Sequence, residues 1–352
     1  MLDGLPVPGI PADLSRDSGD GSVMPPPLAE NSNQIFRGIT RNGRFDLTGD
    51  QARALLRLPN PNGRPNSDVL RPLINGMDIT KRLSDTWAVD FGVDMPEASA
   101  ALYEGPFAYV KEHVLPERMQ NRREVYKKKW WIFAEARPAL RASVKGLRRS
   151  ICTLRLSKYR FFFFLATSVL PEQRLMVIPH DDDEAFGVLS SRMHEVWSLR
   201  WGGIHGDGVE GGRPVYNAEF CFENFPFPPG LAPRLKPEAY TNTHACAIAS
   251  TAAKLNELRE NWLNPTEWVD RIPEIVPGYP DRVLPKSGHE ADVKLRTLTN
   301  LYNAMPTWLV NAHRDLDMAV AKAYGWDTYT ADTTDDEILR RLLALNLERA
   351  AK

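Results

Sequence analysis

The sequence predicts an α+β fold, in which a mixed α/β domain is followed by an all-helical one. Strand-like and helical segments alternate up to about residue 229, and only helical periodicity follows. A proline-rich segment, ENFPFPPG (223–230), separates the two patterns. The chain has 352 residues, of which 43% are hydrophobic, enough for two domains with their own cores. We therefore expect one domain over residues 31–229 and a separable helical domain over residues 230–352.

The first 30 residues contain six prolines and four glycines. Such a segment cannot bury enough apolar surface to fold alone, so residues 1–30 are expected to be a disordered tail or linker. Local patterns then predict the elements before the middle of the chain. They are a short strand (34–39), a helix from about Thr48, a turn-rich loop (58–72), a buried strand (86–91), and a helix capped by Asp94 and restarted at Gly105.

The middle of the chain predicts one amphipathic helix and then several strands. Leu140, Val144 and Leu147 recur at helical spacing, so RPALRASVKGL (137–147) is expected to be a helix with a cationic outer face. The expected elements after it are strands at 151–156, 159–170 and 174–179, a segment at 186–201 that begins extended and becomes a helix capped by Ser190 or Ser191, a glycine-rich loop (202–212), and a last strand (215–222).

Beyond residue 230 the expected elements are helices at about 242–263, 289–303 and 307–324, and a last helix after Thr334. The last helix begins with three acidic residues, which complement the positive end of a helix dipole.

Positive charge is concentrated between residues 118 and 160. This basic segment holds fourteen Lys/Arg and two Glu, about +12, whereas the rest of this near-neutral chain sums to about −13. Aromatic residues, among them Tyr126 and Trp130, are interleaved with the cations. A cationic track with aromatic side chains suits a nucleic acid, because phosphate contacts give affinity and base contacts give specificity. The alternative is a solvated helix face over buried tryptophans.

For several motifs that could bind a ligand or catalyse a reaction, we favour a purely structural interpretation. GDGVEG (206–211) matches a nucleotide-binding loop, but it lies between a helix and a strand instead of between a strand and a helix. The acidic run HDDDE (180–184) could bind Mg²⁺ or Ca²⁺, yet consecutive residues in a turn cannot all face one ion. Asp281, Asp292 and Lys294 loosely fit a nuclease pattern, but the last two fall on a predicted helix. Three scattered cysteines predict neither a disulfide nor a zinc site.

No membrane-spanning run, signal peptide, phosphate-binding P-loop or nucleophile with an evident base is found in the sequence. The two Asn-Pro pairs lack the second proline and aromatic residue that adenine methyltransferases use. The chain is therefore hard to interpret as a catalyst by itself, and we expect it in the cytoplasm.

Long motifs in one order resemble the C-terminal half of the MmeI-like (type IIL restriction–modification) DNA methyltransferases, which methylate adenine at N6. The resemblance extends from about Leu28 to the C-terminus. Its motifs are NGRPNSDVLRPLINGMDIT (62–80), TWAVDFG (86–92), PFAYVKEHVLPER (106–118) with NRR (121–123), WW (130–131) with RPALR (137–141), SKYRFFFF (157–164), VLPEQ (169–173), MVIPHDDDEAFGVLSSRMHEVW (176–197), CFENFPFP (221–228), LTNLYNAMPTWL (298–309), AHRDLD (312–317) and AYGW (323–326).

In that family this half holds a target recognition domain and a helical C-terminal domain. The resemblance thus implies that residues 31–229 recognise a DNA sequence in double-stranded DNA. The S-adenosylmethionine loop and the catalytic Asn-Pro-Pro-aromatic motif lie upstream in the family and are missing here. We expect no cofactor in this chain, no methyl transfer by it alone, and a separately encoded methyltransferase domain as a partner. The chain resembles a truncated product, a split gene or a separated domain.

The candidate DNA-contacting residues fall in two groups. Cations and one aromatic of the basic segment are expected to meet phosphates or bases: Arg118, Arg122, Arg123, Lys127, Lys128, Lys129, Trp130, Lys158 and Arg160. Residues at a predicted helix N-terminus, a position suited to phosphate or base edges, form the second group: Ser190, Ser191, Arg192 and His194. Surface salt bridges are the alternative for each residue. Two other functions stay open, a helical scaffold protein and a single-stranded nucleic-acid binder.

Overall fold

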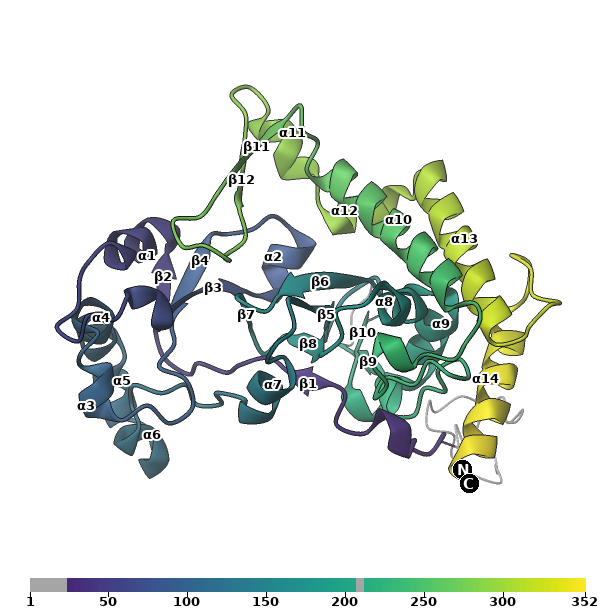
Figure 1. Cartoon of the computed structure of the whole chain (residues 1–352), viewed down its shortest axis with the longest axis horizontal. Coiled ribbons are helices and arrows are strands. Elements are labelled where there is room, and N and C mark those ends of the chain that lie inside the picture. The colour runs from purple at the N-terminus through teal and green to yellow at the C-terminus, as the bar shows by residue number, and fades with distance from the viewer. Residues whose placement is uncertain (1–23, 207–211) are drawn as a thin grey trace.

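The computed structural model describes residues 24–206 and 212–352, and it shows an elongated molecule with two lobes (Figure 1). Each lobe is built around one four-stranded sheet. The first lobe consists of residues 40–136 and one short strand from later in the chain. The second lobe contains the other sheet and the C-terminal helices. The α+β class predicted from the sequence is confirmed.

The sheet of the first lobe has the strand order β2-β4-β3-β7. Its first three strands are antiparallel, with Leu47 opposite Trp87, and β7 joins β3 in parallel. Short helices close a core that includes Phe45 and Trp87. The elements are β2 (Asp46–Thr48), α1 (Gly49–Leu56), η2 (Asn66–Asp68), β3 (Leu70–Ile74), α2 (Gly76–Thr80), β4 (Thr86–Val89), α3 (Glu97–Ala100), α4 (Glu104–His113), α5 (Leu115–Met119), α6 (Glu124–Lys128) and β7 (Leu170–Pro171).

Helix α1 begins where the sequence predicts. The Thr48 hydroxyl accepts the Gln51 backbone N–H at 3.3 Å, and the Gln51 side chain accepts the Thr48 N–H at 3.0 Å. This reciprocal capping satisfies two backbone donors that a helix start otherwise leaves unpaired.

The sheet of the second lobe has the order β1-β8-β5-β6, and all its pairs are antiparallel. Gly38 directly follows β1, and a Cβ atom there would lie 2.3 Å from the Glu172 carbonyl oxygen. Only glycine allows the two backbones to approach this closely. The strands and nearby helices are β1 (Phe36–Arg37), α7 (Pro138–Ser143), β5 (Arg149–Leu154), β6 (Phe162–Ala166), β8 (Leu175–Ile178), α8 (Asp183–Ser190) and α9 (Arg192–Trp201).

The chain passes between the lobes at a pair of hydrogen-bonded residues. The Thr40 N–H donates to the Glu135 carbonyl at 3.1 Å, and the Glu135 N–H donates to the Thr40 carbonyl at 3.0 Å. The segment that leads out of β1 and the segment that leads to α7 therefore run side by side.

The C-terminal helices complete the core of the second lobe. Helices α10 and α13 lie against α8, where a Cβ atom on Gly187 would lie 2.5 Å from the Ile248 side chain and 3.3 Å from the Leu316 side chain. One hydrophobic core thus runs from the β5 and β8 strands to Leu342 of α14. The helices are α10 (Ala245–Leu263), α11 (Glu290–Leu295), α12 (Leu298–Ala304), α13 (Thr307–Ala323) and α14 (Asp335–Ala350).

This core crosses the boundary that the proline-rich segment predicts. Phe225, Phe227 and Leu231 on either side of residue 230 belong to the same cluster as the C-terminal helices. Residues 230–352 are therefore not separated from the preceding residues by a break in packing.

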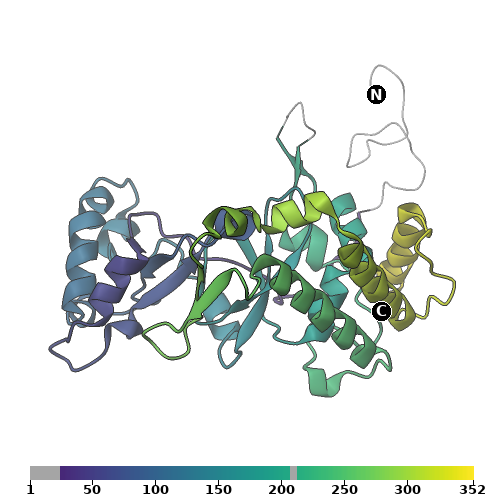
Figure 2. The ribbon, with the colours of Figure 1, turned by 90° about the horizontal axis from the view of Figure 1, so that it is seen from above.

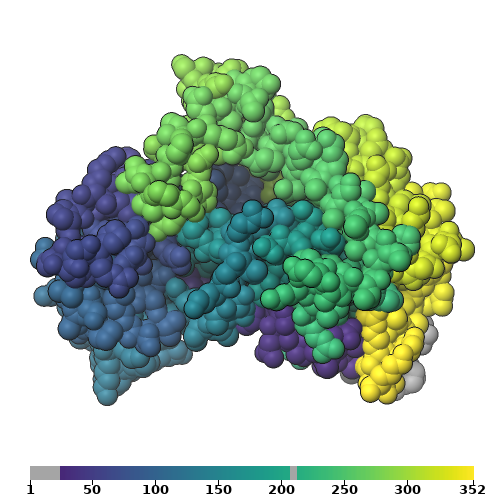
Figure 3. All heavy atoms as spheres, viewed as in Figure 1, coloured from purple at the N-terminus to yellow at the C-terminus, as the bar shows by residue number. Residues whose placement is uncertain are grey.

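A β-hairpin interrupts the C-terminal helices, whereas the sequence predicts only helices in this region. Strands β11 (Val269–Ile272) and β12 (Arg282–Pro285) pair antiparallel, and the turn between them reaches the first lobe. There the Tyr279 hydroxyl lies 2.7 Å from the Leu70 carbonyl, and its ring meets Trp87 edge-on at 5.5 Å. Figure 3 shows this segment in light green lying against the purple first lobe, and Figure 2 shows it from above.

Residues 24–30, expected to belong to a disordered tail, are ordered against the second lobe. Leu28 is buried and its N–H donates to the Glu223 carbonyl at 2.8 Å. Glu30 pairs with Arg349 of α14 at 3.0 Å. The remaining residues of the predicted tail, 1–23, lie outside the described residues.

Local structure departs from the predictions in three further segments. Residues 186–190 were expected to be extended but belong to α8, because Asp182 caps that helix through the Ala185 N–H. The strand expected at 215–222 is a short π-helix, η3 (Ala218–Phe222), capped by Asn217. Helix 289–303 is two helices, which break between Leu295 and Leu298. The remaining short elements are η1 (Ala29–Asn31), β9 (Ile204–His205), β10 (Arg213–Pro214) and η4 (Pro237–Ala239).

In the part of the chain that the structure describes, no helix has the length and apolar character needed to cross a membrane.

Candidate nucleic-acid interface

The cations around α6 form the most exposed part of the basic segment. Arg122, Arg123, Lys128 and Lys129 are exposed, and Lys127 is half-buried beside Glu124 at 2.7 Å. Among the described residues no side chain pairs with Arg122, Lys128 or Lys129. Positive charge without an internal partner is what a polyanion can use. These five side chains, here called the α6 cations, lie in α6 or directly beside it, and their contact with DNA stays a prediction.

The aromatic residues of the basic segment are not available to bases. Trp130 and Trp131 are buried, and the Trp131 indole N–H donates to the Met95 carbonyl at 2.8 Å. Tyr126 is half-buried, and its ring carries the guanidinium groups of Arg118 at 5.0 Å and Arg123 at 5.5 Å. The prediction that Trp130 contacts DNA is wrong, because the tryptophan fills the core of the first lobe.

Arg118 is a structural residue, not a surface cation. It is 1% exposed, and one terminal nitrogen donates to the Arg41 carbonyl at 2.8 Å and the Ile132 carbonyl at 3.0 Å. Burial lowers the pKa of its guanidinium. The contact holds the segment that leads out of α6 against the segment that leads into the first lobe. Its predicted role at a phosphate is therefore excluded.

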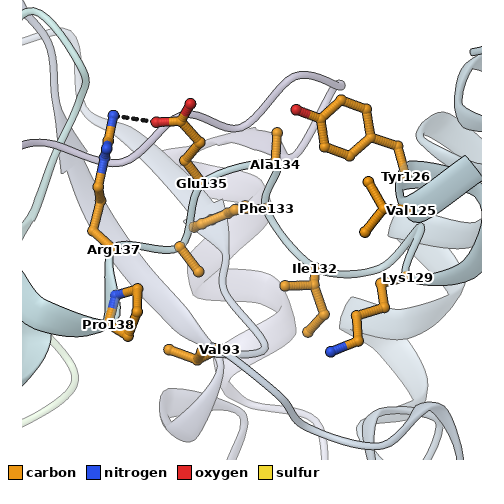
Figure 4. A pocket seen from close by; sticks show the side chains of 11 residues that line it. Val93, Val125, Tyr126, Lys129, Ile132, Phe133, Ala134, Glu135, Arg137 and Pro138 are labelled. Carbon is orange, nitrogen blue, oxygen red and sulfur yellow. Dashed lines mark ion pairs between the residues drawn. The ribbon is translucent and has the colours of Figure 1, made fainter. Parts of the chain in front are cut away.

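A hollow of about 510 Å³ lies between α6 and the start of α7. Figure 4 shows Tyr126 and Lys129 on one side of it and Arg137 and Pro138 on the other, with residues 132–135 between them. Arg137, whose φ of 57° is left-handed, forms an ion pair with Glu135. Of the α6 cations, Lys129 lines this hollow, on the side opposite the start of α7.

The two cations predicted near residue 160 differ in accessibility. Arg160 is buried, and it donates to the Leu154 carbonyl at 2.6 Å and the Thr153 hydroxyl at 3.2 Å. Burial is also the main cause of its lowered pKa. It cannot reach DNA, so that prediction is wrong. Lys158 is exposed, and its ammonium donates to the Asn303 side chain at 3.0 Å.

The predicted helix N-terminus exists, but an internal carboxylate occupies it. Helix α9 starts at Arg192, whose backbone N–H donates to Asp317 Oδ1 at 2.8 Å. The Arg192 side chain pairs with Asp335 at 2.7 Å. Ser191 is fully buried and donates to the Val188 carbonyl at 2.7 Å, and the hydroxyl oxygen of half-buried Ser190 is covered.

His194 is also unavailable to a ligand. It is fully buried, and its Nε2 lies 2.8 Å from the Tyr216 hydroxyl. Burial, with the charge of Arg160, lowers its pKa to about 3, so the ring is neutral. In place of DNA, Ser191 contacts α8, Arg192 contacts α13 and α14, and His194 contacts Tyr216, whereas the covered Ser190 hydroxyl has no partner among the described residues.

Four arginines that the sequence does not single out meet where the lobes join. Arg37 Nε donates to the Gln173 carbonyl at 2.9 Å, and Arg137 Nε donates to the Gly38 carbonyl at 3.1 Å. The Arg155 N–H donates to the Arg174 carbonyl at 2.8 Å. We call Arg37, Arg137, Arg155 and Arg174 the arginine seam. They lie on separate strands and segments, so only the strand register could have revealed them.

The motifs set aside in the sequence remain without a site. No group of three metal-ligating side chains converges anywhere in residues 24–206 and 212–352. Within the acidic run, Asp182 caps α8 and bonds His180 at 2.9 Å. Asp292 and Lys294 lie on helix α11. Most of GDGVEG, residues 207–211, lies outside the described residues.

This two-lobed fold is that of part of a type IIL restriction–modification enzyme, as the resemblance in the sequence implies. The solved structure that shares it is MmeI in complex with DNA, with a TM-score of 0.60 and 18% identity. The match covers 91% of this chain and 36% of the MmeI chain. No protein-family model matches the sequence, and no curated protein does.

Proposed function

We propose that this chain is the DNA-recognition component of an adenine-N6 DNA methyltransferase system of the restriction–modification type. The observation that carries the proposal is the shared fold with MmeI, whose structure was solved in complex with DNA. The α6 cations support it, because Arg122, Lys128 and Lys129 are exposed without a partner among the described residues, and Lys129 lines the hollow between α6 and α7. The expected location in the cytoplasm belongs to this proposal.

Within this proposal the α6 cations bind phosphates and position the protein on the duplex. Phosphate contacts supply most of the salt-dependent affinity and carry no sequence information. Sequence would be read in the major groove, where the four base pairs present different donors and acceptors.

Single-stranded nucleic acid fits the structure less well than a duplex. Binding of single strands uses aromatic faces on which successive bases stack. Trp130, Trp131 and Phe133 are buried, and both guanidinium groups on Tyr126 compete for its ring. The basic segment therefore offers charge without a stacking platform.

Methyl transfer requires a donor site that we assign to a separately encoded methyltransferase domain. In this proposal S-adenosylmethionine binds that domain and the present chain supplies the target sequence. The purified chain, incubated with labelled S-adenosylmethionine and DNA, should transfer no methyl group to adenine. Donor-dependent labelling by the chain alone would contradict this division of roles.

The dependence of DNA affinity on salt tests the α6 cations. A contact with six to eight phosphates gives a slope of about −5 to −7 in log Kobs against log salt. Lys127→Ala, Lys128→Ala and Lys129→Ala together should make the slope less steep by about two to three, because Lys127 is partly neutralised by Glu124. The affinity for every duplex sequence should fall alike.

The matched control replaces three exposed lysines of the C-terminal helices, Lys254, Lys294 and Lys322, by alanine. It removes the same charge, and its slope should equal that of the parent. A triple α6 variant that binds like the parent would remove the α6 cations from the interface. Selection from randomised duplexes should enrich one sequence, and its failure would favour the scaffold function.

A further inference from the structure

The arginine seam gathers positive charge on one face of the second-lobe sheet. Residues directly opposite in an antiparallel pair point to the same face, and the face alternates along each strand. Arg37 lies opposite Met176, and Met176 lies opposite Thr153. Two residues further along this register, Arg155 comes opposite Arg174. The register therefore aims Arg37, Arg155 and Arg174 to the same side of β1, β5 and β8.

The seam has more positive than negative charge. Two carboxylates act on Arg37, those of Glu135 and Glu172. Glu135 forms the ion pair with Arg137, and Glu172 is buried and accepts the backbone N–H of Arg174 at 3.1 Å. Four arginines against two glutamates leave a formal charge of +2.

Three of these arginines lack a counter-charge of their own. In the described part of the chain, no carboxylate lies within ion-pair distance of Arg37, Arg155 or Arg174. Arg37 is half-buried, and its pKa is lowered by burial and then by the charges of Arg155 and Arg137. A partly buried charge is normally paired, because desolvation without a partner is costly. An anion from outside the chain would supply such a partner for Arg37.

The geometry favours a phosphate over a base edge. Arg37 and Arg137 are fixed because each spends its Nε on a backbone carbonyl, of Gln173 and of Gly38. Arg155 and Arg174 are exposed and keep all their side-chain donors. One phosphodiester can accept from several guanidinium groups, whereas a guanine edge accepts from one arginine and would leave the others unneutralised.

We infer that the arginine seam is a phosphate-binding site for the nucleic-acid backbone, distinct from the α6 cations and located where the two lobes join. It rests on the proposed function for the identity of its ligand, a duplex DNA strand. Glu135, which acts on Arg37, pairs with Thr40 where the chain passes between the lobes, so the seam lies beside the first lobe.

The test uses the full chain and the double variant Arg155→Ala/Arg174→Ala. Within residues 24–206 and 212–352 these side chains make no hydrogen bond, so the variant should fold, and its Tm at low ionic strength should not fall below that of the parent. The matched control is Arg234→Ala/Lys236→Ala, which removes two exposed cations that do not act on the seam. If the Tm of the double variant were well below those of the parent and the control, the arginines would stabilise the fold, and the site would be overturned.

Inorganic phosphate is the first probe. At equal ionic strength, phosphate should raise the Tm of the parent and of the control more than chloride does. In the double variant this difference should be smaller, because only the general effect of phosphate, which is excluded from protein surfaces, then remains. Equal responses of the double variant and the parent would overturn the site.

Duplex DNA is the second probe. The salt slope of the double variant should be less steep than that of the parent by about two, and that of the control should be unchanged. If the parent binds DNA through the α6 cations but the double variant has the parental slope, the seam is overturned and the proposed function stands. If the parent binds no duplex yet keeps its phosphate response, the proposed function fails and the anion site stands.

Discussion

At the scale of single residues, Asp317 shows how an internal carboxylate takes a position that suits an external anion. It lies on α13, is 9% exposed, and accepts the backbone N–H of Arg192 at the start of α9. Burial is the main cause that raises its pKa to about 7. Glu195, one turn into α9, also has a raised pKa because of burial. The contact between α9 and α13 is therefore sensitive to pH.

The protonation of Asp317 predicts a stability that falls as pH rises. In the unfolded chain the carboxyl has its ordinary pKa of 3.8, so between about pH 4 and 7 only the folded protein holds the proton. The stability from this proton is complete below pH 4 and lost as pH passes 7. Asp317→Asn keeps an acceptor for the Arg192 N–H, and should raise the free energy of unfolding at pH 8 by on the order of 2 kcal/mol.

Urea unfolding at pH 5 and pH 8 measures this effect. The parent should be less stable at pH 8 relative to Asp317→Asn than it is at pH 5. Asp315→Asn, on the same helix but exposed, should show no such difference. A parallel pH dependence of the parent and Asp317→Asn would mean that Asp317 is ionised in the folded protein throughout.

At the scale of elements, the β11–β12 hairpin connects the C-terminal helices to the first lobe. Glu274 is 2% exposed at its side chain and pairs with Arg53 of α1 at 2.9 Å. Arg53 also pairs with Asp85 at 2.8 Å, and these two carboxylates raise its pKa. A buried ion pair that joins distant segments fixes their geometry more than it stabilises them, because its desolvation offsets much of its attraction.

Breaking this pair should be costly even though forming it contributes little. Glu274→Gln should lower the free energy of unfolding by roughly 2–3 kcal/mol, since Arg53 stays buried but loses its one buried carboxylate partner and keeps only the more exposed Asp85 and Asp50. Glu267→Gln, on an exposed residue just before the hairpin, should change it by less than about 0.5 kcal/mol. Urea unfolding of the parent and the two variants provides the comparison. Equal stabilities would show that the ion pair of Glu274 with Arg53 does not stabilise the protein.

The sequence could predict elements with local causes but not those set by distant contacts. The start of α1 follows from Thr48 and Gln51 alone, and strands β5 and β8 follow from short apolar runs. Arg122 is exposed and Arg118 is buried, although both belong to the basic segment. Arg118 is buried because it donates to the carbonyls of Arg41 and Ile132, which are distant from it in the sequence. Likewise, the position of Tyr279 against the first lobe is set by Leu70 and Trp87, which are distant from it in the sequence.

At the scale of the whole molecule, the second lobe needs residues from both sides of residue 230. Gly187 of α8 lies against Ile248 and Leu316. Asn346 of α14 donates to the Asn224 carbonyl at 2.7 Å and to the Pro26 carbonyl at 3.0 Å. The three segments that these contacts join form one unit with one core.

A fragment of residues 230–352 should therefore not fold as the full chain does. Without α8 and β5, the apolar faces of α10 and α13 would be exposed to water, and burial of such faces is the main source of stability. Near-ultraviolet circular dichroism of the fragment should lack the aromatic signal of fixed packing, while the intact chain shows it. A cooperative thermal transition of the isolated fragment would contradict this expectation.

The first lobe is inserted into the second lobe between β1 and α7, and Thr40 and Glu135 pair where the insertion begins and ends. The segment from Thr40 to Glu135 leaves and re-enters the second lobe at neighbouring points, since these two residues exchange backbone hydrogen bonds of 3.1 and 3.0 Å. The chain entropy lost by holding the two ends of such an insertion together grows only slowly with the length of the insertion. Residues 41–134, with the α6 cations, can thus change in length or sequence without opening the sheet that carries the arginines, as long as β3 keeps its pairing with β7 and Arg53 its pairing with Glu274.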